Sequence, residues 1–179
     1  MAEHPFRLLR SEVLFRGRAF AIRRDVLLTP DGRETRFEIV EHHGSVILLP
    51  LDEAGNLLFV RQYRHAAGEM LLELPAGSLD EGESPEACAA RELREETGYA
   101  AGKLEKVGEF FLAPGYSTEK MSVFIARELY AAPLQADADE FLDLVRLPLE
   151  EALRAAENGE IPDAKSLAAL YLARGRLRA

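Results

Sequence analysis

Residues 91–98 read RELREETG, and the spacing of the glutamates in this stretch raises a question of charge. Glu92, Glu95 and Glu96 stand at i, i+3 and i+4, so a helix would crowd them onto one face, where like charges are destabilising. Two interpretations fit this pattern, a solvated acidic surface or a site for a hard cation. Mg²⁺ takes oxygen ligands and commonly shares them with substrate phosphates, and its charge would cancel the repulsion.

The residues before the glutamates carry the signals of a helix start. Ser84 is a favourable N-cap, Pro85 suits the first helical position, and Glu86 falls in the first turn. Gly98 suits the left-handed conformation that ends many helices. We therefore expect a helix over residues 85–97 that carries all of the glutamates.

The rest of the chain predicts mixed strands and helices. Strands are expected over residues 11–28, 34–42, 45–51, 57–63, 70–77, 104–113, 119–129 and 141–147, and two last helices over 149–158 and 163–177. Because strands and helices do not alternate strictly, the pattern favours an α+β fold, or an α/β/α sandwich. Residues 1–42 form an antiparallel β module too small for a core of its own, so we expect it to pack on the main domain, residues 43–179, or on a second subunit.

Composition and net charge limit the binding partners and the cellular compartment that we expect for this chain. The chain has 179 residues and a formal net charge of −9, and such a field repels nucleic acid and anionic lipid. The sequence has no apolar run near the roughly 20 residues of a membrane span and no secretory signal at its start. The single cysteine, Cys88, excludes an internal disulfide and has no apparent histidine partner, which favours a packed side chain over a nucleophile. We expect a cytoplasmic protein without a nucleic-acid or membrane partner.

The spacing around the glutamates is more selective than their charge. Five residues separate Gly77 from Glu83, and seven more precede RELREETG. This is the pattern of the Nudix box, and the chain resembles the Nudix hydrolase family. Tyr99 departs from the pattern, because the family usually has an aliphatic residue there. The matching positions are Gly77, Glu83, Arg91, Glu92, Leu93, Glu95, Glu96 and Gly98.

The resemblance implies a Nudix-type α/β/α sandwich and Mg²⁺-dependent attack of water on a nucleoside diphosphate derivative, with Mn²⁺ as the other candidate cofactor. A divalent ion polarises a phosphoryl oxygen and acidifies a bound water. Carried over by position, Glu92 and Glu96 are the main metal ligands, and Glu95 is a ligand or a base acting through water. The backbone carbonyl of Ala76 is a further ligand.

The same resemblance gives other residues of the box a supporting role. Glu83 and Arg91 are expected to pair and brace the loop before the helix, outside the set of metal ligands. Gly77 is expected to serve the structure of that loop.

Segments outside the box resemble the ADP-ribose pyrophosphatase branch of the family. The branch implies ADP-ribose as substrate, AMP and ribose 5-phosphate as products, and a homodimer in which residues 1–42 would take part. Nucleotide sugars, dinucleotides and flavin adenine dinucleotide are alternative substrates, and a sensor that binds ADP-ribose without hydrolysis is a further alternative. The intact box carboxylates argue against the sensor. The matching segments are residues 60–84, Pro114, 137–141 and 161–170.

Several residues outside the box are candidates for the site, and each has a structural alternative. Arg64 is a candidate for a phosphate or terminal-ribose contact, because a guanidinium binds phosphate oxygens bidentately; it could equally be a surface arginine at a strand end. Glu73 would contact metal or substrate, or serve as a buried structural group. Glu119 and Glu140 lie in segments that could close over the site and activate water. The other substrate-binding candidates are Arg36 and Phe20, which would border the adenine or serve as surface and core residues, and Pro114 and Gly115.

Overall fold

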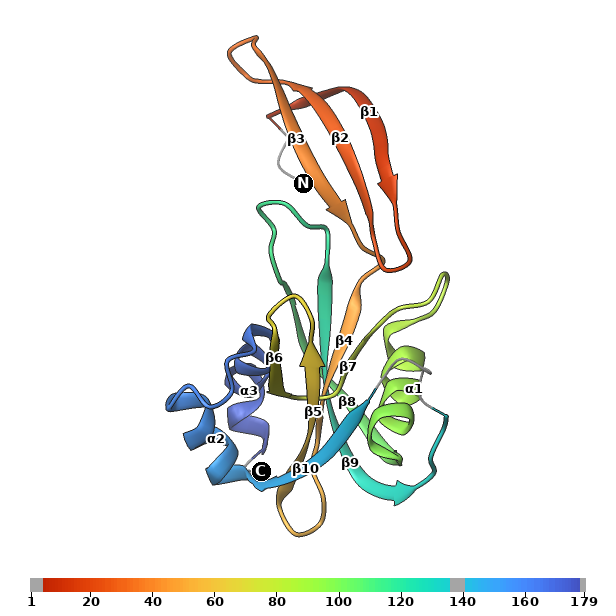
Figure 1. Cartoon of the computed structure of the whole chain (residues 1–179), viewed down its shortest axis with the longest axis vertical. Coiled ribbons are helices and arrows are strands. Elements are labelled where there is room, and N and C mark those ends of the chain that lie inside the picture. The colour runs from red at the N-terminus through yellow and green to blue at the C-terminus, as the bar shows by residue number, and fades with distance from the viewer. Residues whose placement is uncertain (1–4, 136–140, 178–179) are drawn as a thin grey trace. The chain divides into compact units, whose positions relative to one another are not determined.

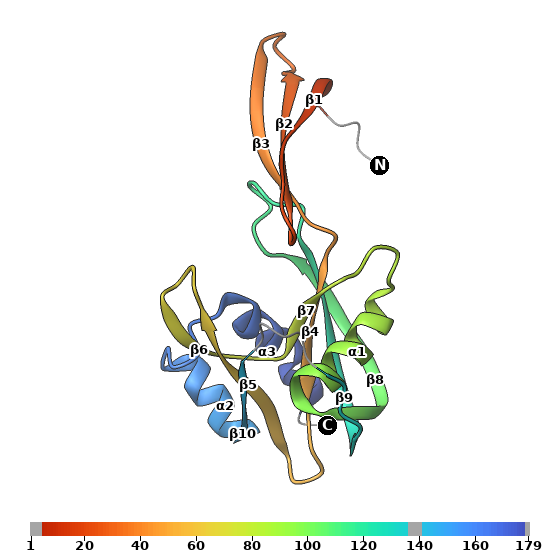
Figure 2. The same cartoon turned by 45° about the vertical axis from the view of Figure 1, so that its right-hand side comes forward.

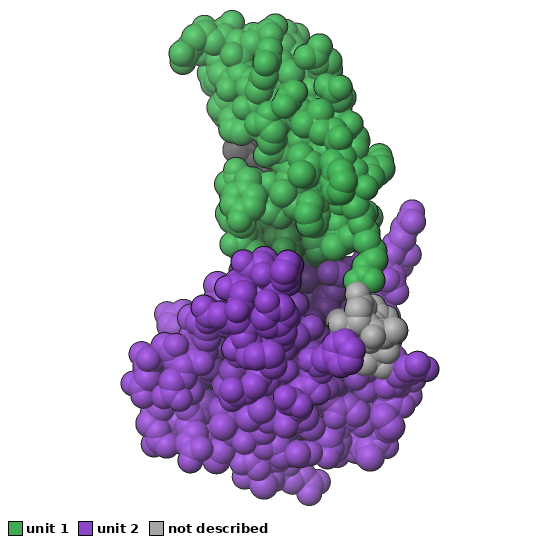
Figure 3. All heavy atoms as spheres, in the orientation of Figure 1, with its two compact units in different colours: residues 1–44, 111–120 green, residues 45–110, 121–179 purple. Residues whose placement is uncertain are grey.

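The computed structural model describes residues 5–135 and 141–177. They form two compact units, which Figure 3 colours separately: unit 1 is Met1–Gly44 with Phe111–Lys120, and unit 2 is Ser45–Phe110 with Met121–Ala179. The sequence analysis expects a boundary after residue 42 and does not assign residues 111–120 to the first module, whereas in the structure they belong to unit 1. Backbone hydrogen bonds explain it, since Val40 exchanges them with Tyr116 and Thr118 at 2.8 and 3.0 Å.

Unit 1 is built on an antiparallel sheet in the order β1-β2-β3 (Figure 1), which comprises β1 (Arg7–Arg16), β2 (Ala21–Leu28) and β3 (Glu34–Glu41). Within residues 11–28, where strand structure is predicted, a hairpin separates β1 from β2; there the Gly17 N–H donates to the carbonyl of Phe20 at 2.9 Å. The turn between β2 and β3 contains Gly32 at φ +84°, a left-handed conformation that glycine adopts at no steric cost. Every residue of the edge strand β1 is exposed.

Unit 2 contains two sheets that share the core. One is antiparallel in the order β10-β5-β6, and the other is mixed in the order β7-β4-β9-β8, with β4 parallel to β9. β4 is buried at every residue, as expected of a central strand. The strands are β4 (Ser45–Pro50), β5 (Asn56–Arg64), β6 (Glu69–Glu73), β7 (Ala76–Ser78), β8 (Tyr99–Phe111), β9 (Lys120–Ala131) and β10 (Leu142–Pro148).

Helices cover the strands of unit 2 on both sides. Figures 1 and 2 show α1 (Pro85–Thr97) on one side and α2 (Leu149–Glu157) and α3 (Ala164–Leu177) on the other. The α+β class and the α/β/α sandwich are therefore confirmed. Within the part of the chain that the structure describes, no helix has the length and apolar character needed to cross a membrane.

Both ends of α1 follow the local chemistry of the sequence. The Ser84 hydroxyl accepts the Ala87 N–H at 3.2 Å and caps the first turn. At the other end Gly98 adopts φ +77°, and its N–H donates to the Arg94 carbonyl at 3.1 Å. The predicted helix bounds are confirmed, because these caps depend only on neighbouring residues.

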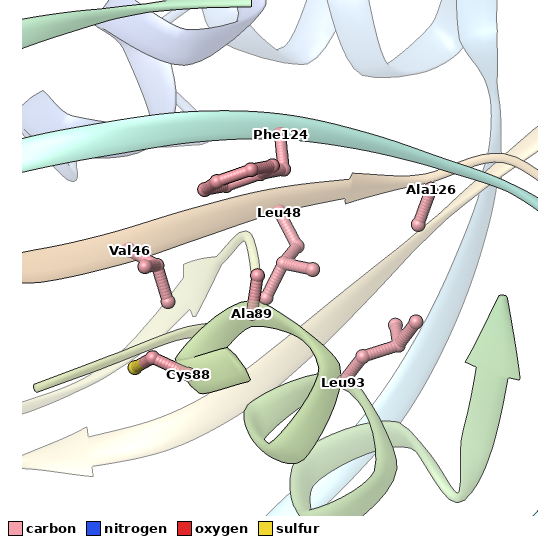
Figure 4. Packing of buried hydrophobic residues seen from close by; sticks show 7 residues of the cluster. All are labelled: Val46, Leu48, Cys88, Ala89, Leu93, Phe124 and Ala126. Carbon is pink, nitrogen blue, oxygen red and sulfur yellow. The ribbon is translucent and has the colours of Figure 1, made fainter. Parts of the chain in front are cut away.

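One face of α1 packs into the core (Figure 4). Burial of Cys88 raises the pKa of its thiol, and the charge of Glu92 adds to this, so the side chain stays a protonated packing group as the sequence indicates. This anchoring of α1 fixes where its other residues point. The cluster comprises Cys88, Ala89 and Leu93 of α1, Val46 and Leu48 of β4, and Phe124 and Ala126 of β9, each at most 1% exposed.

Candidate functional site

The glutamates of α1 do not form a solvated surface. Only 7% of Glu92 and 8% of Glu96 is exposed, and the side chain of Glu95 is 22% exposed. Burying a carboxylate costs free energy unless charges or hydrogen bonds compensate. The interpretation as an acidic surface is therefore wrong for Glu92 and Glu96, and the compensating groups must be close by.

Arg91 supplies much of that compensation. Its Nη1 donates to Glu92 at 2.7 Å and to Glu95 at 2.9 Å, while Nε and Nη2 donate to the two oxygens of Glu83 at 3.0 and 2.8 Å. The hydrogen bonds that Arg91 donates to Glu83 are the main reason that the pKa of Arg91 is raised, and the same pairing lowers the pKa of Glu83. Arg91 thus forms the predicted pair with Glu83 and also holds two of the candidate metal ligands.

Glu96 is held by the chain before the helix. The backbone N–H of Ala76 donates to Oε2 of Glu96 at 3.1 Å. Ala76 itself is fixed by pairing with Ile47 of β4. The residue whose carbonyl was predicted to be a metal ligand is therefore in direct contact with one of the predicted carboxylate ligands.

Gly77 leaves room for a carboxylate. A Cβ built on Gly77 would lie 1.9 Å from both Cδ and Oε1 of Glu92, which is far inside van der Waals contact. Its backbone has no positive φ, so conformational freedom does not explain the glycine. The absence of a side chain at this position creates the space in which Glu92 lies.

A second charged group lies at the end of β5. Nε and Nη2 of Arg64 donate to the two oxygens of Glu73 at 2.8 and 2.7 Å, and Lys165 also donates to Glu73, which is 1% exposed. Burial acts to raise the pKa of Glu73, but the hydrogen bonds from Arg64 and the charge of Lys165 outweigh it and lower the pKa. The pKa of Arg64 is raised, first by Glu73 and further by the charge of Glu96, so Arg64 lies within electrostatic reach of α1.

The sequence analysis does not predict that Lys165 joins Arg64 and Glu73, nor that its neighbours at the start of α3 take part. Lys165 lies in residues 161–170, a segment that resembles the ADP-ribose pyrophosphatase branch but contains no predicted site residue. The signal available in the sequence was Asp163, a favourable N-cap two residues before Lys165.

The adenine candidates lie in unit 1. Phe20 is 43% exposed and lines a hollow of about 320 Å³ whose walls include Arg16 and Arg18. Arg36 is exposed on β3, paired in register with Val26. An aromatic ring and cationic groups therefore share one hollow, and Arg36 is not part of it.

The other loop candidates also belong to unit 1. Pro114 and Gly115 are exposed in a turn, where Tyr116 N–H donates to the Ala113 carbonyl at 3.1 Å. Glu119 is partly buried, and its carbonyl accepts the Leu112 N–H at 3.3 Å. Glu140 lies outside the described residues.

The donor chemistry of α1 suits a hard divalent cation, although its present arrangement is closed by Arg91. Among residues 5–135 and 141–177, no three His, Cys, Asp or Glu side chains are grouped in a way that could hold a metal ion. The Arg91 guanidinium bridges Glu92 and Glu95 instead. Buried carboxylate oxygens on adjacent turns, beside a backbone without a side chain at Gly77, are the oxygen donors that Mg²⁺ prefers. Arg91 contacts one oxygen of each carboxylate, so the second oxygen of Glu92 or Glu95 would be the one to face an ion.

Comparison with known proteins agrees with this site. A family model described as NUDIX domain matches residues 41–170, which include α1 and all the charged groups described above in unit 2. The chain belongs to the NUDIX family. The predicted resemblance to this family is thereby confirmed, and the buried carboxylates of α1 lie within the matched residues.

Relatives of this NUDIX protein span most of its length. It is 37% identical over 164 residues to the ADP-ribose pyrophosphatase of Bacillus subtilis, covering 90% of this chain and 89% of that protein. It is 41% identical over 171 residues to the ADP-ribose pyrophosphatase of Mycobacterium tuberculosis, covering 94% and 83%. A crystal structure of an ADP compounds hydrolase matches with a TM-score of 0.86 and 28% identity, over 99% of this chain and 97% of the other.

Proposed function

We propose that this NUDIX protein hydrolyses ADP-ribose to AMP and ribose 5-phosphate with Mg²⁺ as cofactor, and that Mn²⁺ can take its place. The observation that carries the proposal is the burial of Glu92 and Glu96 on α1, beside the space left by Gly77. The similarity to two ADP-ribose pyrophosphatases over most of the chain supports the choice of substrate.

The carboxylates of Glu92, Glu95 and Glu96 and the carbonyl of Ala76 would hold the ion. When bound, the ion supplies polarisation of a phosphoryl oxygen and acidification of a water molecule. Arg91 orients Glu92 and Glu95 in the absence of the ion, because it contacts both.

Arg64 binds a phosphate group of the substrate. Glu73 engages its Nε and Nη2, and among the described residues no hydrogen bond or ion pair engages its Nη1. The side chain is 40% exposed, so part of it is accessible to a ligand. A guanidinium forms strong charge-assisted hydrogen bonds with phosphate oxygens.

Other candidates complete the proposal. Glu95, Glu119 and Glu140 are the carboxylates that could accept the proton of the attacking water. Phe20 and Arg36 would border the adenine, and Pro114 and Gly115 would contact the substrate from their turn.

We also propose that the protein is a homodimer in which residues 1–42 take part. β1 is an edge strand whose ten residues are all exposed, and an exposed strand edge is a template for pairing. A concentration of large exposed apolar side chains in one small unit marks an interaction surface. In unit 1 these are Leu8, Leu9, Val13, Leu14, Phe15, Phe20, Phe37, Phe111 and Tyr116, each at least 40% exposed.

A cytoplasmic location completes the proposal, since Cys88 is the single cysteine and is buried as a thiol. The net charge of −9 supports a small-molecule substrate over a nucleic-acid or membrane partner.

A ranking of substrates tests the function. The protein is incubated with Mg²⁺ and with ADP-ribose, ADP-glucose, GDP-mannose, NADH or diadenosine polyphosphates, and kcat/KM is compared. ADP-ribose is expected to rank first. A higher rank for another compound would favour the broader activity suggested by the ADP compounds hydrolase, and tight binding of ADP-ribose without cleavage would favour a sensor.

A further inference from the structure

Residues 73–77, the segment ELPAG, connect the start of α3 to the carboxylates of α1. Glu73 accepts hydrogen bonds from Arg64 and Lys165, and the N–H of the next residue, Leu74, donates to the Ser166 hydroxyl at 2.8 Å. Two residues further on, the Ala76 N–H reaches Glu96. The segment ELPAG thus contacts both the cluster around Glu73 and the carboxylates of α1.

The first turn of α3 is itself locked by a side chain. Asp163 precedes the helix, and its Oδ2 accepts the Ser166 N–H at 3.0 Å and the Ser166 hydroxyl at 2.5 Å. Its Oδ1 pairs with Lys165 Nζ at 2.9 Å. The side chains of Asp163 and Lys165 are 14% and 13% exposed, and Ser166 is fully buried. The same aspartate therefore caps α3 through one oxygen and holds Lys165 through the other.

The charges of this group balance. Two cations, Arg64 and Lys165, lie with two carboxylates, Glu73 and Asp163. Removing one partner of a buried carboxylate destabilises the folded protein, so each of these four side chains helps to keep the others in place. Because Lys165 binds the same Glu73 oxygen as Nη2 of Arg64, it fixes the plane of the carboxylate onto which the guanidinium docks.

We propose that Lys165 and Asp163 are positioning residues for substrate binding. Through Glu73 they hold the Arg64 guanidinium in one orientation before the substrate binds, so that Nη1 is already placed for a phosphate oxygen. The proposal rests on the proposed function, in which Arg64 binds the substrate phosphate. An arginine side chain has many rotamers, and fixing it before binding raises affinity.

A double-mutant cycle in KM tests the proposal. Lys165→Met is expected to raise KM for ADP-ribose about 3- to 10-fold in the Arg64 background, with a smaller change in kcat. In the Arg64→Ala background the same substitution should change KM little, because the group it positions is gone. Lys165→Arg, which keeps the charge, should restore most of the affinity. Equal effects of Lys165→Met in both backgrounds would overturn the proposal.

Two further variants serve as controls, one for loss of the α3 cap and one for a nonspecific effect of losing a lysine–glutamate pair. Asp163→Asn keeps a good N-cap but removes the charge that holds Lys165, so it should raise KM in the same direction while the helix is retained. Lys106→Met removes another lysine–glutamate pair, with Glu109 at 2.6 Å on β8, and should leave KM unchanged. A similar rise in KM for Lys106→Met would show that the effect is not specific to this group.

A measurement independent of activity separates this inference from the proposed function. The NMR order parameter of the Arg64 Nε–H vector should fall in Lys165→Met and recover in Lys165→Arg. If the wild-type protein cleaves no compound of the panel, the proposed function is refuted, but the order-parameter measurement still tests the positioning role because it does not depend on activity. An order parameter that does not change in Lys165→Met refutes the positioning role, whatever the substrate.

Discussion

The carboxylate of Glu92 fills the volume that a side chain at Gly77 would need. A Cβ at position 77 would meet Cδ and Oε1 of Glu92 at 1.9 Å and Oε2 at 2.4 Å. Glu92 comes from the second half of α1 and Gly77 from β7, so the contact joins two elements that the chain connects through the loop before the helix. Gly77 and Glu92 are therefore sterically matched, because the Glu92 carboxylate occupies the place of any side chain at position 77.

Gly77→Ala is expected to displace the Glu92 side chain and lower turnover. The obstacle is the far end of a flexible side chain, so the protein should still fold, with a loss of about 1–3 kcal/mol in the free energy of unfolding. A displacement of about 1 Å at a metal ligand should reduce kcat/KM on the order of 10²-fold. Gly108→Ala on β8 is the matched control, because a Cβ there meets nothing within 4 Å. Comparable activity of the two variants would contradict the steric argument.

Glu96→Gln is expected to remove metal binding while the fold is kept. The amide oxygen of glutamine can still accept the Ala76 N–H, but it lacks the charge that a divalent ion needs. Turnover should fall by about two orders of magnitude or more. Mg²⁺ should raise Tm of the wild type, since a ligand of the folded state stabilises it, and raise Tm of the variant less. Glu86→Gln, in the exposed first turn of α1, should behave as the wild type; near-normal turnover of Glu96→Gln would refute the metal assignment.

The stability that Lys165 confers should depend on pH. The folded state holds the pKa of Glu73 below its ordinary value of 4.5, so its ionised form stabilises the protein above that pH, and this stability is lost as pH falls through the lower folded pKa. Because Glu73 keeps its hydrogen bonds with Arg64, Lys165→Met should cost about 1–3 kcal/mol in the free energy of unfolding at neutral pH. The difference from the wild type should begin to shrink below about pH 4.5, where the unfolded chain binds the proton first, and should vanish once Glu73 is protonated in the folded state as well. Urea unfolding between pH 3 and pH 7 measures it, and a difference that stays constant with pH would exclude the ion pair as its cause.

Leu14→Asp on β1 is expected to separate the proposed dimer. Leu14 is 42% exposed in unit 1, and a charge buried in an apolar interface lacks a partner. The dissociation constant should rise at least about tenfold, measured by sedimentation equilibrium. Tyr171→Asp, at a tyrosine 79% exposed on α3, is the control and should leave the mass unchanged. If the wild-type protein sediments as a monomer, the role proposed for residues 1–42 is wrong.

The sequence predicted the features that depend on neighbouring residues. The ends of α1 follow from Ser84 and Gly98, and the turn between β2 and β3 follows from its glycine. The hairpin at Gly17 was missed because apolar and polar residues continue across it without the usual paired turn residues.

Contacts between distant parts of the chain were not predictable in the same way. Ala76 and Glu96 lie 20 positions apart, and Glu73 and Lys165 lie 92 positions apart. Their contacts depend on how α1 and α3 pack on the sheets, and no local pattern encodes that. The box pattern predicts which glutamates are candidate ligands, whereas their burial and the hydrogen bonds they accept from Arg91 are visible only in the folded chain.

The segment ELPAG has a consequence for how this site can change. Its contacts with α3 use the Glu73 side chain and the Leu74 backbone, and its contact with α1 uses the Ala76 backbone. An added or deleted residue between Glu73 and Ala76 would shift one set of contacts relative to the other, even if every charged residue were retained. This stretch therefore acts as a spacer of fixed length, in which the count of residues matters more than the identity of its apolar side chains.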